Sequence, residues 1–268
     1  MATVADSGQE RKVSGGRVFE RAFAAIRHNP GPTIGLAFLF GAVPGLLVAI
    51  LMQQLRPQMM AASIQDGSMA GFYALTLLSV VLGQIISALT QAALTRATVA
   101  ESEGRRASFG ESIRAGMAVL LPLVILSILL AICVMIGFML LIVPGVILYC
   151  MWSVAVPTLV EERRGIFGSF GRSRELTSGA RWKIFGILLV LVVVYWLVSM
   201  AAGIFAMSNI DITNPQAGFD LPVSFYVVNV IVGTLINLFW ATVQASLFVE
   251  LRNWKDGPAT ENLQQIFA

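Results

Sequence analysis

Long apolar blocks separated by short polar segments dominate the pattern of this chain. Six blocks stand out, at about 33–52, 72–95, 117–141, 144–160, 184–207 and 223–249. A helix needs roughly 20 predominantly apolar residues to cross the hydrocarbon core of a bilayer. The pattern therefore predicts an all-α integral membrane protein with six transmembrane helices.

The third and fourth blocks are joined by Val143-Pro144-Gly145. Proline removes a backbone donor and glycine permits turn conformations, so this tripeptide predicts a tight turn at the membrane surface. The two blocks would then form a hairpin. Because the fourth span is short, we expect it to extend a few residues past Glu161 or to lie in a locally thinned bilayer.

The polar segments carry the charge, and its distribution predicts the orientation. All of the 18 lysines and arginines except Arg56 fall in the N-terminal segment, the second and fourth connections and the C-terminal tail. The positive-inside rule therefore predicts that both termini lie in the cytoplasm. The chain divides into a cytoplasmic N-terminal segment with an amphipathic helix (1–32), a six-helix membrane domain (33–250) and a short cytoplasmic tail (251–268).

A threefold pattern accompanies the six spans. Short segments of similar texture precede the first, third and fifth spans, at 19–23, 109–113 and 170–174. Each even-numbered span ends with an apolar residue and a glutamate; these glutamates are Glu101, Glu161 and Glu250. We infer three repeats, each an amphipathic interfacial helix followed by a transmembrane hairpin.

Local signals support the short helices. Ser108 and Glu111 have the spacing of a capping box, in which each side chain satisfies an early backbone donor. Gly179 is placed to end the third short helix in a left-handed conformation. Helices of this kind lie along the headgroups with their apolar faces in the membrane.

The segment 161–183 is the most basic of the connections, with six basic and three acidic residues. Anionic headgroups attract such a segment by about 1 kcal/mol per basic residue near the surface. The alternative is simple positive-inside anchoring without lipid specificity. The candidate headgroup-binding residues are Arg163, Arg164, Arg172, Arg174, Arg181, Lys183 and Trp182.

Carboxamides are the polar groups that stand inside the spans. Gln84 and Gln91 lie seven residues apart in the second span, and Asn237 and Gln244 repeat that spacing at matching depth in the sixth. They are expected either to hydrogen-bond between helices, at about 0.6–2 kcal/mol each, or to line a cavity for a headgroup or small solute. No ionisable residue lies in the middle of a predicted span, which weakens the case for a coupled transporter.

The sequence offers no recognisable catalytic centre. Hydrolases need a nucleophile with a base, paired carboxylates or a metal cluster. His28 is the single histidine, Cys133 and Cys150 lie inside apolar blocks without a CxxC motif, and no glycine-rich phosphate loop occurs. We therefore expect no enzyme activity, no metal site and no cofactor.

The stretch 143–188 goes beyond general membrane character. It combines the proline-glycine hairpin with Arg172-Ser173, Leu176-Thr177, Gly179 and Trp182. In these features it resembles the glycerophosphoryl diester phosphodiesterase membrane-domain family, including its stand-alone bacterial inner-membrane members. The resemblance implies six spans in a bacterial inner membrane. It does not imply phosphodiesterase activity, which in fused members belongs to a separate soluble barrel that this chain lacks.

Together these features favour a non-enzymatic multi-pass membrane module, a lipid- or partner-binding accessory or scaffold of the cell envelope. Its expected partners are anionic membrane lipids, and also another membrane protein or a second copy of the chain, but not nucleic acid. The alternative is a small-solute or lipid-headgroup permease or exporter that uses the polar face of spans two and six.

Overall fold

The computed structural model describes residues 13–105, 107–207 and 223–257, and the regular structure in these ranges is helical. In chain order the elements are α1 (Gly15–His28), α2 (Pro30–Ala37), the π-helical turn η1 (Phe38–Ala42), α3 (Val43–Asp66), α4 (Ala70–Ser102), α5 (Phe109–Ala118), α6 (Leu120–Leu140), α7 (Ile142–Met151), α8 (Ala155–Glu162), α9 (Gly165–Thr177), α10 (Arg181–Met207) and α11 (Val223–Asp256).

Six helical runs in the described part of the chain are long and apolar enough to cross a membrane. They are Pro30–Met59, Ala70–Ser102, Leu120–Leu140, Ile142–Glu162, Arg181–Phe205 and Tyr226–Asp256. In five of them only 11–22% of the most apolar window is buried inside the protein. Such an extent of exposed apolar surface is typical of a lipid-facing helix. The prediction of an all-α, multi-pass fold is confirmed.

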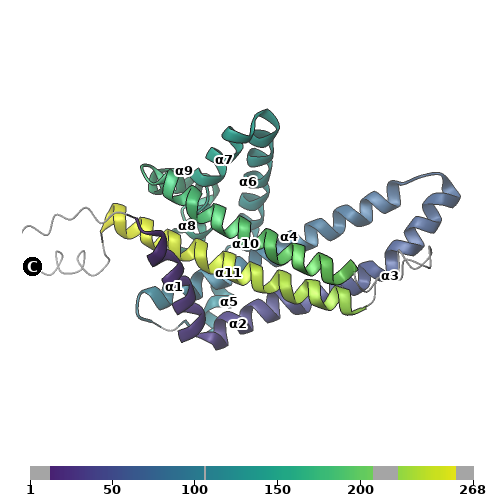
Figure 1. The fold of residues 1–268 in the computed structure, drawn as a ribbon, viewed down its shortest axis with the longest axis horizontal. Helices are drawn as coiled ribbons and strands as arrows, with labels where there is room; N and C mark the ends of the chain where they lie inside the picture. Colours follow the sequence, from purple (N-terminus) through teal and green to yellow (C-terminus); the bar gives the residue numbers. More distant parts are fainter. Residues whose placement is uncertain (1–12, 106, 208–222, 258–268) are drawn as a thin grey trace, which may run out of the picture.

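The long helices α4, α10 and α11 run along the longest axis of the molecule (Figure 1). α1 lies beside α11, and the α6–α7 hairpin projects away from the other helices (Figure 1). Hydrogen bonds join Ser87 of α4 to Asn237 of α11, and Gln91 of α4 to Gln244 of α11. The later residue of α4 thus contacts the later residue of α11. α4 and α11 therefore run in the same direction, as the matched amide depths predict.

The α6–α7 hairpin forms, but not through the predicted turn. The break falls at Leu141, whose backbone is extended, and Pro144 and Gly145 lie inside the first turns of α7. Proline is tolerated there because the first helical N–H groups lack intrahelical acceptors. A Cβ on Gly145 would lie 2.5 Å from the Phe138 ring, and one on Gly137 would lie 3.0 Å from the Gly145 Cα. The glycines therefore permit close packing of α6 on α7 and are not needed for a turn conformation.

The fourth span is divided by a turn between Met151 and Ala155. The Ser173 hydroxyl of α9 donates to the Met151 carbonyl at 2.9 Å, and the Thr177 hydroxyl donates to the same oxygen at 3.2 Å. The last carbonyls of a helix need such partners. α9 thus satisfies the end of α7, and the span resumes as α8 and ends at Glu162.

Short helices precede the first, third and fifth spans, where the sequence predicts them. The Ser108 hydroxyl accepts from the Glu111 N–H at 3.1 Å, which confirms the cap of α5. Gly179, after α9, has a φ of +85°, as predicted. The apolar residues of α1 are divided: Val18 and Ala22 are buried in a cluster with residues of α10 and α11, whereas Phe23 is exposed. The threefold repeat itself stays a prediction.

Candidate functional site

Ionisable side chains gather where α4, α8 and α11 end, beside α1, α5 and α9 (Figure 1). We call this region the basic end. The glutamates that close the even-numbered spans lie here, although a carboxylate near the C-terminus of a helix is opposed by the helix dipole. Each of the three has a cationic or ring-nitrogen partner on another helix, as the following contacts show.

Glu250 is held by α1 through both carboxylate oxygens. Arg17 Nε donates to Glu250 Oε1 at 2.8 Å, and Arg21 Nη1 lies 2.9 Å from Oε2. The Ser14 N–H reaches Oε1 at 3.4 Å. Because the Glu250 side chain is only 6% exposed, it needs these charges to offset its desolvation. We call this contact the Glu250 joint, and it fixes α1 on α11.

Glu161 is held through one oxygen only. Arg96 Nη1 donates to Glu161 Oε2 at 2.9 Å, while Arg96 Nη2 donates to Glu111 Oε1 at 2.8 Å. Glu161 Oε1 is buried and has no hydrogen-bond partner among the described residues. A cavity of about 710 Å³ adjoins it, the Glu161 cavity, which is lined by Arg96, Ser108, Gly110, Glu111, Arg114, Ala115, Ala118, Val160, Glu161 and Arg163.

The third glutamate and its neighbour link α4 to α1 and α11. His28 Nδ1 lies 3.1 Å from Glu101 Oε1. Glu103, just after α4, has two arginine partners. Arg105 Nη2 lies 3.1 Å from Glu103 Oε2, and Arg252 Nη2 lies 3.2 Å from Oε1. Burial, the largest influence, favours the neutral form of Glu103, but the two arginines outweigh it and lower its pKa.

The sequence-predicted headgroup residues fall into two groups. Arg172 is 7% exposed and forms ion pairs with Glu162, Glu175 and Asp256. Burial would lower its pKa, but these carboxylates outweigh that influence and raise it. Arg164 pairs with Glu162 at 2.7 Å. Arg172 is therefore used within the protein, whereas 53% of the Arg164 side chain is exposed; that these two arginines meet headgroups stays a prediction.

The remaining predicted headgroup residues are exposed. Within the described ranges, none of their cations has a carboxylate at ion-pair distance; they are Arg163, Arg174, Arg181 and Lys183. Trp182 stands between two of them with 86% of its surface exposed, and Phe167 on α9 is 82% exposed. We call Arg174, Arg181, Lys183, Trp182 and Phe167 the basic aromatic surface.

The four predicted amides are divided as well. Gln91 donates to Gln244, and Asn237 Nδ2 donates to the Ser87 hydroxyl at 2.9 Å. Gln84 is exposed and lines a cavity of about 210 Å³ together with Gln91 and Gln244. Sequence reasoning missed Ser87, although its position three residues after Gln84 places it near the same helical face.

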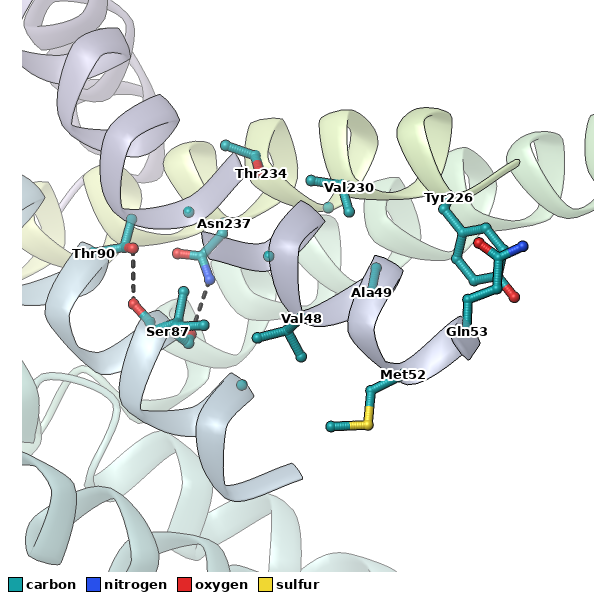
Figure 2. Close-up of a pocket in the computed structure, with 15 residues that line it drawn as sticks. Val48, Ala49, Met52, Gln53, Ser87, Thr90, Tyr226, Val230, Thr234 and Asn237 are labelled. Carbon is teal, nitrogen blue, oxygen red and sulfur yellow. Dashed lines mark hydrogen bonds between the residues drawn. The ribbon is translucent and has the colours of Figure 1, made fainter. Parts of the chain in front are cut away.

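A cavity of about 410 Å³ lies between η1–α3, α4 and α11 (Figure 2). Val48, Met52 and Val230 give it aliphatic walls, and the Asn237–Ser87 hydrogen bond lies on one side (Figure 2). A Cβ on Gly41 would meet Thr234 at 3.3 Å, so the glycine allows η1 to approach α11 closely. This largely apolar lining suits a hydrocarbon chain better than an ion.

In the portion that the structure covers, no group of three or more His, Cys, Asp or Glu side chains could hold a metal ion. Cys133 and Cys150 are both free thiols. His28 Nδ1 lies 3.1 Å from Glu101 Oε1, and this contact joins two side chains and not the three of a metal-binding group. The cluster at the basic end is thus best described as a network of arginine and glutamate pairs.

Comparison with known proteins gives a family. The sequence model of an uncharacterised protein family (UPF0259) matches residues 65–243, about two thirds of the chain. A UPF0259 membrane protein of Pectobacterium carotovorum is 28% identical over 198 residues, 74% of this chain and 70% of the relative. One of Serratia proteamaculans is 25% identical over 210 residues, 78% of this chain and 74% of the relative. No solved structure matches.

These matches overturn the resemblance to the glycerophosphoryl diester phosphodiesterase membrane-domain family, for which they give no support. The residues that suggested it have general structural roles: Gly145 allows helix contact, Ser173 and Thr177 cap α7, and Gly179 follows a helix end. The chain is a multi-pass membrane protein that belongs to the uncharacterised protein family UPF0259.

Proposed function

We propose that this chain is a non-catalytic module of a bacterial inner membrane that binds anionic lipid headgroups at its basic end. The observation that carries the proposal is the basic aromatic surface. Its three cations have no carboxylate partner in the described part of the chain, whereas Arg17, Arg96 and Arg172 are all paired. Unpaired cations are the ones available to phosphate.

The chemistry of that surface suits a headgroup layer. Each lysine or arginine near an anionic membrane surface contributes about 1 kcal/mol of attraction. Tryptophan favours the headgroup level because its ring is apolar and its N–H is polar. Trp182, between Arg181 and Lys183 at the start of α10, places an aromatic ring beside two cations.

The proposal includes an orientation. The basic end lies where α4, α8 and α11 end, and the positive-inside rule assigns such an end to the cytoplasm. Both termini would then be cytoplasmic. Anionic lipids in the inner leaflet would be the nearest partners.

We favour binding over transport because the amides are used between helices. Gln91 is bonded to Gln244, and Asn237 is bonded to Ser87. In lipid such bonds contribute about 0.6–2 kcal/mol each to helix association. A permease would need these groups to line a water-filled path; the four bonded groups are used in helix contacts, although Gln84, Gln91 and Gln244 also border a cavity of about 210 Å³.

The test compares two double variants in nanodiscs that contain phosphatidylglycerol. Arg181→Gln with Lys183→Gln removes two unpaired cations, and we expect retained phosphatidylglycerol to fall about 30-fold, at about 1 kcal/mol per cation. Arg105→Gln with Arg164→Gln removes the same charge from exposed but paired arginines and should have little effect. Equal losses in the two variants, or no loss in the first, would contradict the proposal.

A further inference from the structure

The Glu161 cavity is bordered by a carboxylate, one oxygen of which has no donor among the described residues. The Glu161 side chain is 7% exposed, and its Oε1 has no partner among the described residues while Oε2 is bonded to Arg96. Leaving a buried charged acceptor unsatisfied is costly. Glu161 lines the cavity but Oε1 itself is buried, so a donor in the cavity would complete the hydrogen bonding of this carboxylate through a turn of the side chain.

The same cavity also contains donors without an acceptor. Arg114 of α5 and Arg163 after α8 both line it, and in the ranges described neither has a carboxylate at ion-pair distance. Ser108 and Gly110 bring the N-terminus of α5 to the cavity wall. The positive end of a helix dipole favours an anion at this point.

Arg163 adopts an unusual backbone. Its φ is +50° and its ψ is 33°, and among the described residues it is the one non-glycine position with positive φ. Glycine usually occupies such positions because a Cβ is crowded there. Residues held in sparsely populated conformations cluster at functional sites. An arginine here therefore suggests that its charge is needed beside the cavity.

We propose that the Glu161 cavity binds a zwitterionic group that carries both a primary ammonium and a phosphate, as in phosphatidylethanolamine. The ammonium donates to the Glu161 carboxylate at the cavity wall, and the phosphate accepts from Arg114 and Arg163. A simple anion would meet the carboxylates of Glu161 and Glu111, and a simple cation would meet the arginines. The volume of about 710 Å³ lies within the usual range of ligand sites.

This inference does not depend on the basic aromatic surface. None of Arg174, Arg181 and Lys183 lines the Glu161 cavity. Loss of phosphatidylglycerol binding at that surface and loss of zwitterion binding here are therefore separate results, obtained with separate variants.

The test uses the full chain in nanodiscs with equal amounts of phosphatidylethanolamine, phosphatidylcholine and phosphatidylglycerol, and native mass spectrometry of the retained lipids. Phosphatidylcholine is the critical comparison because its quaternary ammonium has no N–H to donate. We expect the wild-type protein to retain phosphatidylethanolamine about tenfold over phosphatidylcholine, the preference of one charge-assisted hydrogen bond. Equal retention of phosphatidylethanolamine and phosphatidylcholine would overturn the proposal.

Variants assign the preference to the cavity. Arg163→Gly suits the positive φ and removes the charge, so it should reduce retained phosphatidylethanolamine about tenfold while thermal stability is unchanged or higher. Arg114→Gln should do the same, and Glu161→Gln should abolish the preference over phosphatidylcholine. Arg27→Gln, an exposed arginine on α1 outside the cavity, is the matched control. Retention that is unchanged in Arg163→Gly and Arg114→Gln would sink the assignment.

Soluble phosphoethanolamine identifies the source of the group. Displacement of bound lipid by millimolar phosphoethanolamine would show that a free solute suffices. Retention of the lipid would show that its acyl chains are needed. Both results support the shared chemistry, provided that phosphocholine displaces less lipid than phosphoethanolamine does; equal displacement by the two would contradict it.

Discussion

Glu250 and Glu161 occupy equivalent places in the sequence, each next to an apolar residue at the end of an even-numbered span, but their surroundings differ. Both oxygens of Glu250 meet arginines of α1. Glu161 has Arg96 on one oxygen and no hydrogen-bond partner on the other among the described residues, and a cavity borders the residue. Both oxygens of Glu250 lie at ion-pair distance from arginines, although Arg21 Nη1 makes no hydrogen bond, whereas one oxygen of Glu161 has no partner among the described residues.

The difference shows how the same residue can serve structure at one site and binding at another. A buried carboxylate requires compensation, and the number of guanidinium groups within reach decides how much of it the protein supplies. α1 brings Arg17 and Arg21 to Glu250, whereas Arg96 is shared between Glu161 and Glu111. The uncompensated oxygen is the position where a ligand can contribute.

The largest expected effect is a difference between the two glutamates in how much a substitution lowers the free energy of unfolding. Glu250→Gln should lower the free energy of unfolding by about 3 kcal/mol, because it leaves two arginines around a neutral amide. Glu161→Gln should cost about 1 kcal/mol, because Arg96 keeps Glu111. Unfolding in mild detergent, followed by circular dichroism, measures both; equal losses would erase the distinction between the sites.

The next-largest effect concerns the packing of α4, which carries Arg96, on α11, which carries Glu250. Gln91→Leu or Gln244→Leu alone should cost about 1–2 kcal/mol, since each leaves the other amide without its partner. The double variant should cost no more than either single variant, because the unpaired amide is gone. A double-mutant cycle in the same unfolding assay checks this, and additive losses would show that the two side chains do not interact.

A smaller effect of opposite sign is expected at the rim of the Glu161 cavity. Arg163→Gly should raise the free energy of unfolding by about 1 kcal/mol by removing the crowded Cβ. Arg174→Gly, inside α9, is the control and should lower it by about 0.5–1 kcal/mol. A fall in stability for both variants would mean that Arg163 has a structural role and is not kept for its charge.

The smallest effect concerns Glu103, which contacts Arg252 of α11 and Arg105 of the α4–α5 connection and so lies between the two sites. Its pKa is lowered in the folded protein. The stability it contributes is therefore complete above its unfolded pKa of about 4.3 and is lost as the pH falls through the lower folded pKa. We expect Glu103→Gln to cost about 0.5 kcal/mol at pH 7.

The same pH titration of wild-type protein and Glu103→Gln provides the check. The difference between their free energies of unfolding should stay constant from pH 7 to about pH 5 and shrink at lower pH. A difference that grows on acidification would show that the carboxylate opposes the fold.

The features that the sequence predicts well depend on residues close together in the chain. The six spans follow from the length of the apolar blocks, the cap of α5 from Ser108, and the helix end from Gly179. The hydrogen bond between Gln91 and Gln244 is the exception, because it joins residues far apart in the chain. It could be predicted because the amides have equal spacing in two spans that run in the same direction, which places them at equal depth.

The features that the sequence does not predict depend on distant partners. From the sequence, Arg172 is predicted to be a headgroup ligand. The structure pairs it with Asp256, which lies 84 residues away in the chain. From the sequence, Gly145 is predicted to be a turn residue. In the structure it packs against the Phe138 ring. The empty side of Glu161 cannot be seen from the sequence at all, because Glu101, Glu161 and Glu250 share the same local pattern.

The most direct test of this contrast is an experimental structure of the full chain in nanodiscs that contain phosphatidylethanolamine, with a bound antibody fragment to aid alignment. We predict a phosphate within hydrogen-bond distance of Arg114 and Arg163, an amine bonded to the Glu161 carboxylate, and arginines alone at Glu250. A cavity closed by protein, with a side chain or backbone donor bonded to Glu161 Oε1, would contradict the account.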